Sequence, residues 1–345
     1  MPLTVRRALC FAGAFGFAAL ACLASASADA SVLDAIRARG HVLCGVGDGP
    51  RGYAAVSGQG TWSGISVDFC RALAAAVLGS REAVQFRSLS GAEHLAALQT
   101  GEVDVLSRNV VITSSLDTTQ GIRFPGVLVY DGQGFLVRKA QNVTSALELS
   151  GARICVTTES ADTQGVADFF NGLKLPFDLQ KFEKWADAKT AYANKSCQVL
   201  SADTSTLAAA RQLLPDAAEH IILPELASKQ FVGPAVRQGD DDWFSVVRWT
   251  IYALIAAEEL GITSSNIDTM KSSASAEVRR FLGIDLDFGK RLGLSPDWTQ
   301  RIVKQVGNYG ELFDRHLGAK SPLKLERRLN NLATNGGLHY APSFR

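Results

Sequence analysis

Cysteine and histidine are the residue types whose spacing most directly indicates chemistry, and here they exclude two kinds of site. The chain has 345 residues, of which 6 are Cys and 5 are His. No two histidines have the HxxxH spacing of a helical zinc site. No CxxC pair occurs, which argues against a thiol redox motif. We therefore expect no metal and no cofactor.

A glycine-rich stretch matches a nucleotide-binding pattern but lacks the helix that such a site needs. Gly47 to Gly52 fits GxGxxG directly after a predicted strand. In a dinucleotide site a helix begins at this point, because its N-terminus holds the pyrophosphate. Pro50 and the turn-rich stretch 57–60 follow instead. No Walker sequence and no G-x-S-x-G elbow is present either, so we expect no nucleotide site and no serine hydrolase.

The first 28 residues have the layout of a secretory signal. Arg6 and Arg7 precede an apolar run, 8–23, which is short of the ~20 residues that span a membrane. The small residues Ala26 and Ala28 then offer a cleavage site. We predict that residues 1–28 are a cleaved signal peptide and that the mature protein lies in the periplasm.

Export changes what the cysteines indicate. Four remain after cleavage: Cys44, Cys70, Cys155 and Cys197. An even number in an oxidising compartment favours disulfides over buried thiols. Three pairings are possible. Cys44 with Cys70 and Cys155 with Cys197 are the pairings closest in sequence, and they place one bond in each half of the chain.

Composition and charge describe a globular chain with no nucleic-acid partner. Hydrophobic residues make up 47% of the sequence, enough for a core, and the length favours two domains. The net charge is +1 and the basic residues are scattered. A sequence-independent nucleic-acid binder needs a basic face, so we expect none.

The elements that must position any site follow a strand–helix rhythm that occurs twice. This rhythm predicts two largely parallel sheets, with ligand chemistry at the carboxyl ends of the strands. Two extended segments, 130–139 and 231–237, follow the two series and suggest a protein of two lobes with a cleft. We expect strands at 42–46, 84–86, 103–106, 154–157 and 198–201, and helices at 65–78, 92–100, 163–171, 185–194, 204–214 and 243–260.

Several long stretches resemble the general L-amino-acid-binding proteins of polar amino-acid ABC transporters, which are type II periplasmic-binding proteins. They are residues 64–72, 101–109, 130–135, 233–240 and 307–311. The resemblance implies an α/β fold of two lobes, each a mixed sheet flanked by helices, joined by two hinge segments. It places residues 29–136 and 237–345 in lobe 1 and 137–236 in lobe 2. It also implies a monomer without catalysis that closes on a small-molecule ligand and delivers it to an inner-membrane ABC permease.

An amino acid brings two charges into its pocket, and both must be paired because desolvation costs several kcal/mol. The ammonium needs a carboxylate, and the resemblance assigns that role to Asp203, just after a predicted strand. The alternative is that Asp203 caps the helix that follows. An aromatic wall is expected from Tyr53 or Trp62, unless these side chains only pack on their loop.

The loops that the resemblance assigns to the ligand's carboxylate depart from the family pattern. Val111 stands where the family has Thr, and Leu116 stands where it has the main Arg. In lobe 2, Glu159 and Ser160 replace a Gly-Thr-Thr donor loop, and Glu159 would repel a carboxylate. Within the first loop, Arg108, Asn109 and Val111 remain the expected ligand contacts, as does Ser160 in the second.

Three alternatives follow from these departures. In the first, Arg108 or another cation replaces the missing arginine, and an amino acid still binds. In the second, the ligand carries less negative charge, as an amine, an amide, an amino alcohol or a cationic peptide does. In the third, the fold has left amino-acid capture and serves as a sensory or other binding protein. An enzyme on this fold is the fourth possibility, although a carboxylated substrate would also need the arginine that Leu116 replaces.

Overall fold

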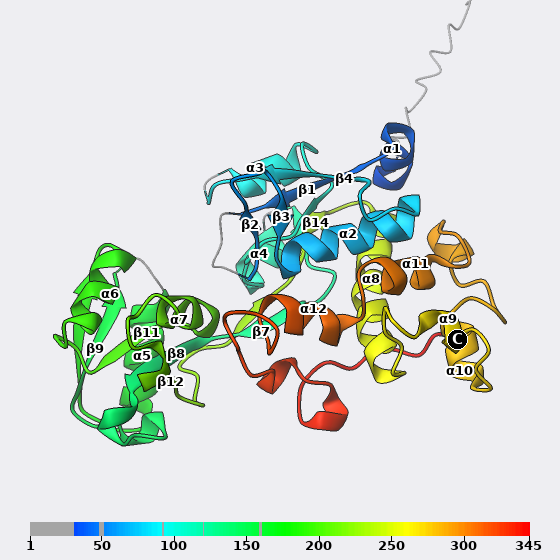
Figure 1. Cartoon of the computed structure of the whole chain (residues 1–345). Coiled ribbons are helices and arrows are strands. Elements are labelled where there is room, and N and C mark those ends of the chain that lie inside the picture. Colours follow the sequence, from blue (N-terminus) through cyan, green and yellow to red (C-terminus); the bar gives the residue numbers. More distant parts are fainter. Residues whose placement is uncertain (1–30, 48–51, 92, 120, 159–160) are drawn as a thin grey trace, which may run out of the picture. The chain divides into compact units, whose positions relative to one another are not determined.

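The computed structural model describes residues 31–47, 52–91, 93–119, 121–158 and 161–345, and two sheets organise them (Figure 1). The predicted signal peptide, most of the GxGxxG stretch, Glu159 and Ser160 lie outside these residues. No helix among the described residues is long and apolar enough to cross a membrane.

The first sheet has the strand order β4-β1-β5, and all three strands are parallel. A single antiparallel bridge from Leu106 to Ala235 adds the returning chain to its edge. Helix α2 packs on this sheet and against α8 and α11. The bounds are β1 Val42–Val46, α2 Ile65–Leu78, β4 Val84–Ser88, α3 His94–Gln99, β5 Val105–Leu106, α8 Asp241–Glu259 and α11 Trp298–Gln305.

The predicted helix over 65–78 is confirmed, and its apolar stripe packs on the core. Ile65, Phe69 and Leu73 are fully buried along it. The helix ends at Gly79, whose φ of 82° is the left-handed conformation that glycine adopts at little cost. Gly64 at the start has φ 133°, and a Cβ there would lie 2.1 Å from the Tyr53 carbonyl oxygen, so only glycine fits.

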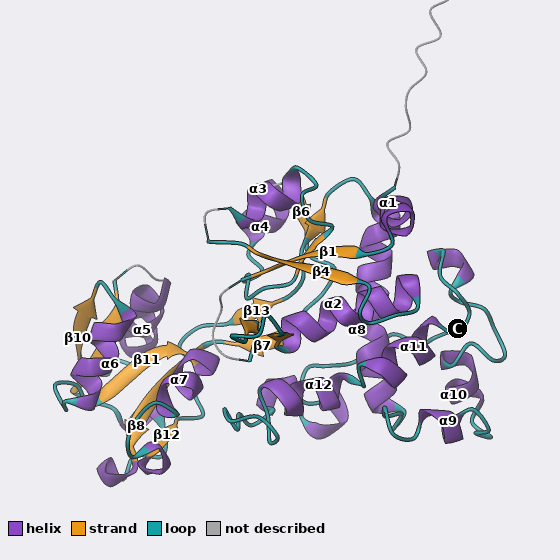
Figure 2. Ribbon diagram, turned by 45° about the horizontal axis from the view of Figure 1, so that its top comes forward, coloured by secondary structure: helices purple, strands orange, loops and turns teal. Residues whose placement is uncertain are grey.

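The second sheet is mixed, with the order β10-β9-β11-β8-β12. Strands β10, β9 and β11 are parallel, whereas β8 is antiparallel to both of its neighbours. Figure 2 shows α5, α6 and α7 around this sheet, and each contacts its strands. The bounds are β8 Gln133–Arg138, β9 Ala152–Thr157, α5 Ala161–Gly172, β10 Phe177–Phe182, α6 Trp185–Ala193, β11 Val199–Asp203, α7 Thr204–Arg211 and β12 His220–Ile222. Phe182 and Trp185 pack on this lobe's core.

The two extended crossings form antiparallel ribbons at the hinge. β7 (Val129–Asp131) pairs with β13 (Gln230–Val232), and β14 (Val236–Arg237) pairs with β6 (Ile122–Arg123). The expected lobe boundary between 136 and 137 falls inside β8, which pairs within the second sheet along its whole length. Residues 133–136 therefore go with the second sheet, because a strand cannot be divided from its ladder.

The predicted disulfides are confirmed, one in each sheet layer. Cys44 on β1 is bonded to Cys70 on α2, with 6.3 Å between the Cα atoms. Cys155 on β9 is bonded to Cys197, just before β11, with a Cα separation of 5.8 Å. Each bond therefore fixes local packing within one lobe.

The remaining helices and strands lie in the N-terminal and C-terminal parts of the chain. They are α1 Val32–Arg39, β2 Ala55–Val56, β3 Trp62–Ser63, α4 Ser114–Thr119, α9 Ile267–Met270, α10 Ala276–Phe281 and α12 Tyr309–His316. After α12 the chain has only short turns, yet it is held to the core at its end. There the Phe344 ring lies 5.2 Å from Trp249 and 5.1 Å from Phe281.

Candidate functional site

Asp203 is the last residue of β11 and stands at the N-cap position of α7. Its side chain makes no capping hydrogen bond. Instead its Oδ1 accepts a 2.6 Å hydrogen bond from Nε2 of Gln230, on the hinge strand β13. The capping alternative therefore does not describe how this carboxylate is used, and an amide from the hinge helps to orient it.

A second carboxylate, Asp131 at the end of β7, is what holds the start of α7. Its Oδ1 accepts hydrogen bonds from Thr204 Oγ1 and from the Gly132 N–H at 2.8 Å. Its Oδ2 accepts from Ser205 Oγ at 2.6 Å and from the Tyr53 hydroxyl at 3.3 Å. Three parts of the fold therefore meet on one buried carboxylate: the loop after β1, the hinge, and the first turn of α7.

Tyr53 is buried in this network rather than displayed as an open aromatic wall. Its side chain is 2% exposed. Burial, followed by the negative charge of Asp131, raises the pKa of its hydroxyl well above the usual value. The phenol therefore stays protonated and donates to Asp131. Our sequence analysis did not single out Asp131 or Gln230, although an acid that ends an apolar strand was a visible signal.

The first lobe contributes the loop after β5, where Arg108 crosses the carboxyl ends of the strands. Its Nη1 donates to the carbonyl oxygens of Leu89 at 3.1 Å and Ser90 at 3.0 Å. A Cβ at Gly47, after β1, would lie 2.9 Å from the guanidinium, so glycine makes room for it. Burial and, second, the charge of Arg108 lower the pKa of His94 at the start of α3. This edge of the sheet is thus cationic.

The two departures in this loop are packed as apolar residues. Val111 forms an antiparallel bridge with Val232 of β13 and packs on the main core. Leu116 lies on α4 and packs on a satellite core with Leu95 and Phe124. Both side chains therefore hold the loop in place, and neither supplies a hydrogen-bond donor to a ligand.

The other predicted contacts divide between the two lobes. Asn109 is half-buried in the bend between Arg108 and Val111. Trp62 packs against Phe86, with 5.9 Å between ring centroids, and its carbonyl accepts from Arg71 at 3.0 Å. Thus Arg108, Asn109 and Val111 share one loop. Tyr53 donates to Asp131 and lies within reach of the charge of Asp203, whereas Trp62 packs on lobe 1. Within the described part of the chain, no group of three or more His, Cys, Asp or Glu side chains is arranged to hold a metal ion.

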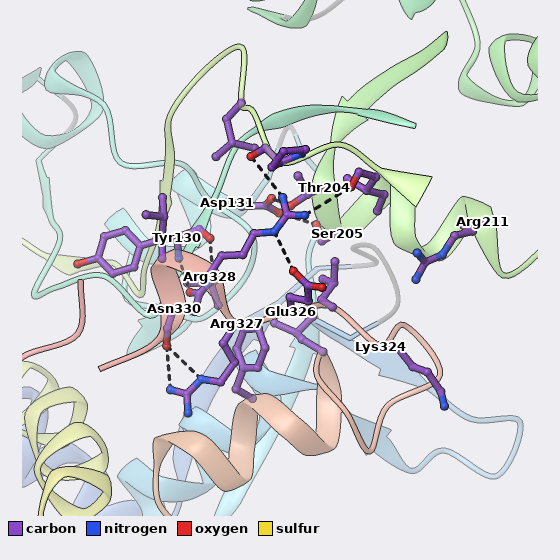
Figure 3. A pocket seen from close by; sticks show the side chains of 18 of the residues that line it. Tyr130, Asp131, Thr204, Ser205, Arg211, Lys324, Glu326, Arg327, Arg328 and Asn330 are labelled. Atoms are coloured by element: carbon purple, nitrogen blue, oxygen red, sulfur yellow. Dashed lines mark hydrogen bonds and ion pairs between the residues drawn. The ribbon is translucent and has the colours of Figure 1, made fainter. Parts of the chain in front are cut away.

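A pocket of about 350 Å³ lies beside the hinge, between α7 and the chain that follows α12. Figure 3 shows Arg211 entering from α7, and Lys324, Arg328 and Asn330 from the C-terminal chain. Asp203 is not among its lining residues. Polar and basic groups therefore gather beside the hinge, in a pocket that Tyr53 and Asp131 also line.

Comparison with known proteins identifies the family of the chain and several relatives. Residues 43–265 match the model of "Bacterial extracellular solute-binding proteins, family 3". The "General L-amino acid-binding periplasmic protein AapJ" of Rhizobium johnstonii is 48% identical, over 96% of this chain and 98% of that protein. The "Glutamate/glutamine/aspartate/asparagine-binding protein BztA" of Rhodobacter capsulatus is 44% identical over 96% of this chain and 98% of that protein.

A solved structure shares the fold over most of the chain. It is an ABC-transporter periplasmic binding protein from Brucella ovis with glutathione bound. That protein is 44% identical, the match covers 92% of this chain and 100% of that one, and the TM-score is 0.80. The two-lobed architecture described above is therefore that of a periplasmic binding protein.

Proposed function

We propose, since this chain belongs to family 3 of the bacterial extracellular solute-binding proteins, that it is the periplasmic receptor of an ABC transporter. Its ligand is an amino acid or a related ammonium-bearing small molecule, including a short peptide. The receptor binds without catalysis and hands its ligand to an inner-membrane permease. The family match and two relatives named as amino-acid-binding proteins support this proposal.

The single observation that carries the ligand class is the Asp203 carboxylate. It stands at the end of β11, and its side chain makes no capping hydrogen bond to α7. Gln230 orients one of its oxygens from the hinge. A preoriented carboxylate is the partner that a desolvated ammonium group requires, since such a group costs several kcal/mol to bury unpaired.

The other end of the ligand is recognised differently from the family pattern. Leu116 packs on the satellite core, so position 116 on α4 offers no arginine to bind a carboxylate. Arg108 is the cation that remains in this loop, and its Nη1 already serves two backbone carbonyls. A ligand whose carboxylate is amidated, or lies far from its ammonium group, suits this arrangement. The relative solved with glutathione bound supports the inclusion of short peptides.

Closure of the two lobes is the mechanism we propose for binding. The ligand is held by Asp203 from one lobe and by the loop of Arg108 and Asn109 from the other. A ligand that contacts both lobes stabilises the closed arrangement by its extra affinity for that state. The β7–β13 ribbon connects the lobes and carries Gln230, so the hinge and the ammonium site are joined through one side chain.

A thermal-shift screen of the mature, ligand-stripped protein tests the proposal. The panel holds the twenty L-amino acids, their amides, simple amines, glutathione and unmodified tripeptides. A specific ligand at a hundredfold excess over its Kd stabilises the fold by about 2.7 kcal/mol. Stabilisation by amino acids, amides or peptides supports the receptor function and ranks the classes. Absence of any shift across the panel, confirmed by calorimetry, would contradict it and favour a fold repurposed for another periplasmic role.

A further inference from the structure

The chain after α12 lies across the hinge and contacts both lobes. We call residues 320–341 the C-terminal strap. At the hinge, the Asn330 side chain accepts from the Tyr130 N–H and donates to the Tyr130 carbonyl, both at 2.8 Å. The strap therefore continues the β7–β13 ribbon on its free edge, as an extra strand would.

Lobe 1 anchors the strap firmly. Arg327 forms an ion pair with Glu258 on α8, one of whose hydrogen bonds is 3.0 Å. The His339 ring lies 4.1 Å from the Tyr309 ring and 5.0 Å from that of Tyr130. Burial lowers the pKa of His339 to about 3, so the ring packs there as a neutral group. The strap is thus a fixed part of lobe 1 that extends toward lobe 2.

Two arginines join the strap to lobe 2, and we call them the arginine clasp. Arg328, on the strap, donates to the carbonyl oxygens of Leu223 at 3.1 Å, Pro224 at 3.3 Å and Ile222 at 3.4 Å. Arg211, in the last turn of α7, donates in the opposite direction, to the Leu323 carbonyl at 3.0 Å. Figure 3 shows both arginines at the pocket between α7 and the strap.

The geometry of Arg328 indicates that its position is imposed by the fold. Its φ of 44° lies in the left-handed region of the backbone, which residues other than glycine rarely adopt. Such a conformation persists where the surrounding contacts hold it. Here Asn330, two residues on, is fixed to β7, and the Arg328 guanidinium also pairs with Glu326 at 3.4 Å. The guanidinium is therefore aimed at the end of β12 by its backbone.

The strap and β13 hold opposite edges of β7. β13 pairs along one edge, with Phe231 opposite Tyr130. Asn330 occupies the other edge, because it takes both backbone groups of Tyr130. The clasp bonds join the strap to lobe 2 beside this hinge, so a rotation of lobe 2 about the ribbon changes the distance between the strap and residues 222–224. The arrangement described here is therefore the one that the clasp bonds stabilise.

We propose that Arg211 and Arg328 form a clasp that opposes lobe closure and so sets the ligand affinity without touching the ligand. This inference rests on the proposed receptor function for its effect on affinity. Closure on a ligand breaks the clasp bonds. The free energy needed to break them makes the observed binding weaker by the same amount. Weakening the clasp therefore tightens binding.

Calorimetry with L-glutamine and glutathione as probes tests this in the mature protein. Arg328→Gln and Arg211→Gln are each expected to tighten binding about fivefold, as follows from the loss of a partly exposed, charge-assisted bond. Arg291→Gln is the matched control, because Arg291 is an exposed arginine of lobe 1 outside the clasp. Unchanged or weaker affinity in both clasp variants, with cooperative melting retained, overturns the proposal.

Fluorescence energy transfer separates failure of the clasp from failure of the receptor function. Dyes on Glu183→Cys in lobe 2 and Ser272→Cys in lobe 1, both exposed positions, report the distance between the lobes without ligand. Arg328→Gln is expected to shift the transfer efficiency of the ligand-free protein, and Arg291→Gln to leave it unchanged. An unshifted distribution overturns the clasp even if neither probe binds. A shift without binding by either probe supports the clasp and counts against these ligands alone.

Discussion

The two halves of the proposed ligand site are built from different kinds of residue. In lobe 2, Asp203 offers a carboxylate that Gln230 orients and that makes no capping hydrogen bond to α7. In lobe 1, the corresponding loop has Val111 in the main core and Leu116 in a satellite core. Polar pairing prepares one half for a charge, whereas apolar side chains occupy two positions of the other half, beside Arg108.

This difference indicates which end of a ligand governs recognition. Charge-assisted hydrogen bonds are roughly twice as strong as neutral ones, so we expect the lobe that carries Asp203 to supply most of the specificity. The apolar lobe supplies shape and the remaining cation, Arg108. The contrast predicts a receptor that is strict about the ammonium group and tolerant at the carboxylate end. Four measurements test this contrast, and they are taken from the largest expected effect to the smallest.

Removal of one disulfide tests whether the two lobes lose stability independently of each other. In the chain-entropy model, the loss of Cys155–Cys197 lowers the free energy of unfolding by about 4 kcal/mol, and that of Cys44–Cys70 by about 3.5 kcal/mol. Urea unfolding of the Cys155→Ser/Cys197→Ser variant measures the larger loss. Hydrogen exchange should place the lost protection within lobe 2. Loss spread equally over both lobes would contradict their separation.

Asp203→Ala removes the charge on which the contrast depends. We expect the affinity for an ammonium-bearing ligand to fall about a hundredfold, or about 2.7 kcal/mol, because the ammonium loses its buried partner. Calorimetry with the strongest ligand of the screen measures this. Asp187→Ala, an exposed acid at the start of α6, is the control and should bind normally. Unchanged affinity in Asp203→Ala would remove this residue from the site.

Leu116→Arg restores a charge to the apolar half. We expect affinity for amino acids to rise about tenfold relative to their amides, because a bidentate arginine recognises the free carboxylate. The ratio of the two dissociation constants is the measurement, since it cancels any general loss of stability. Leu116→Met keeps the volume without the charge and should leave the ratio unchanged. An unaltered ratio in Leu116→Arg would mean that α4 does not face the ligand.

Tyr53→Phe removes one donor from Asp131 and keeps the ring. The free energy of unfolding should fall by about 1 kcal/mol, the value of one hydrogen bond to a buried group that retains other donors. Ligand affinity should change less than threefold, because Asp203 is untouched. Tyr340→Phe is the control, at a side chain that is 73% exposed. A large loss of affinity without loss of stability would give the Tyr53 hydroxyl a direct role in binding.

Much of the fold followed from local pattern. The helix over 65–78 and the strand over 42–46 lie where the periodicity predicted, because an apolar stripe or run needs only a nearby core to fix its structure. The disulfides follow the sequence-local pairing, since each joins neighbouring elements of one layer. The elements nearest the hinge were less predictable: the segment 130–139 divides into β7 and β8, which belong to different sheets.

From the sequence alone follow the two-lobed α/β organisation, a predicted export signal and the residue types at the family's ligand positions. The sequence also favours, among three possible pairings, the disulfide pairing that the structure has. Only the tertiary structure decided how the polar groups are used. There Asp131 accepts from the hydroxyls of the first turn of α7, and Asp203 accepts from Gln230. Tyr53 is buried, and Arg328 donates to carbonyl oxygens of lobe 2. The reason is physical: periodicity acts over a few residues, whereas a carboxylate or guanidinium takes the partner that the folded chain brings to it from far away in sequence.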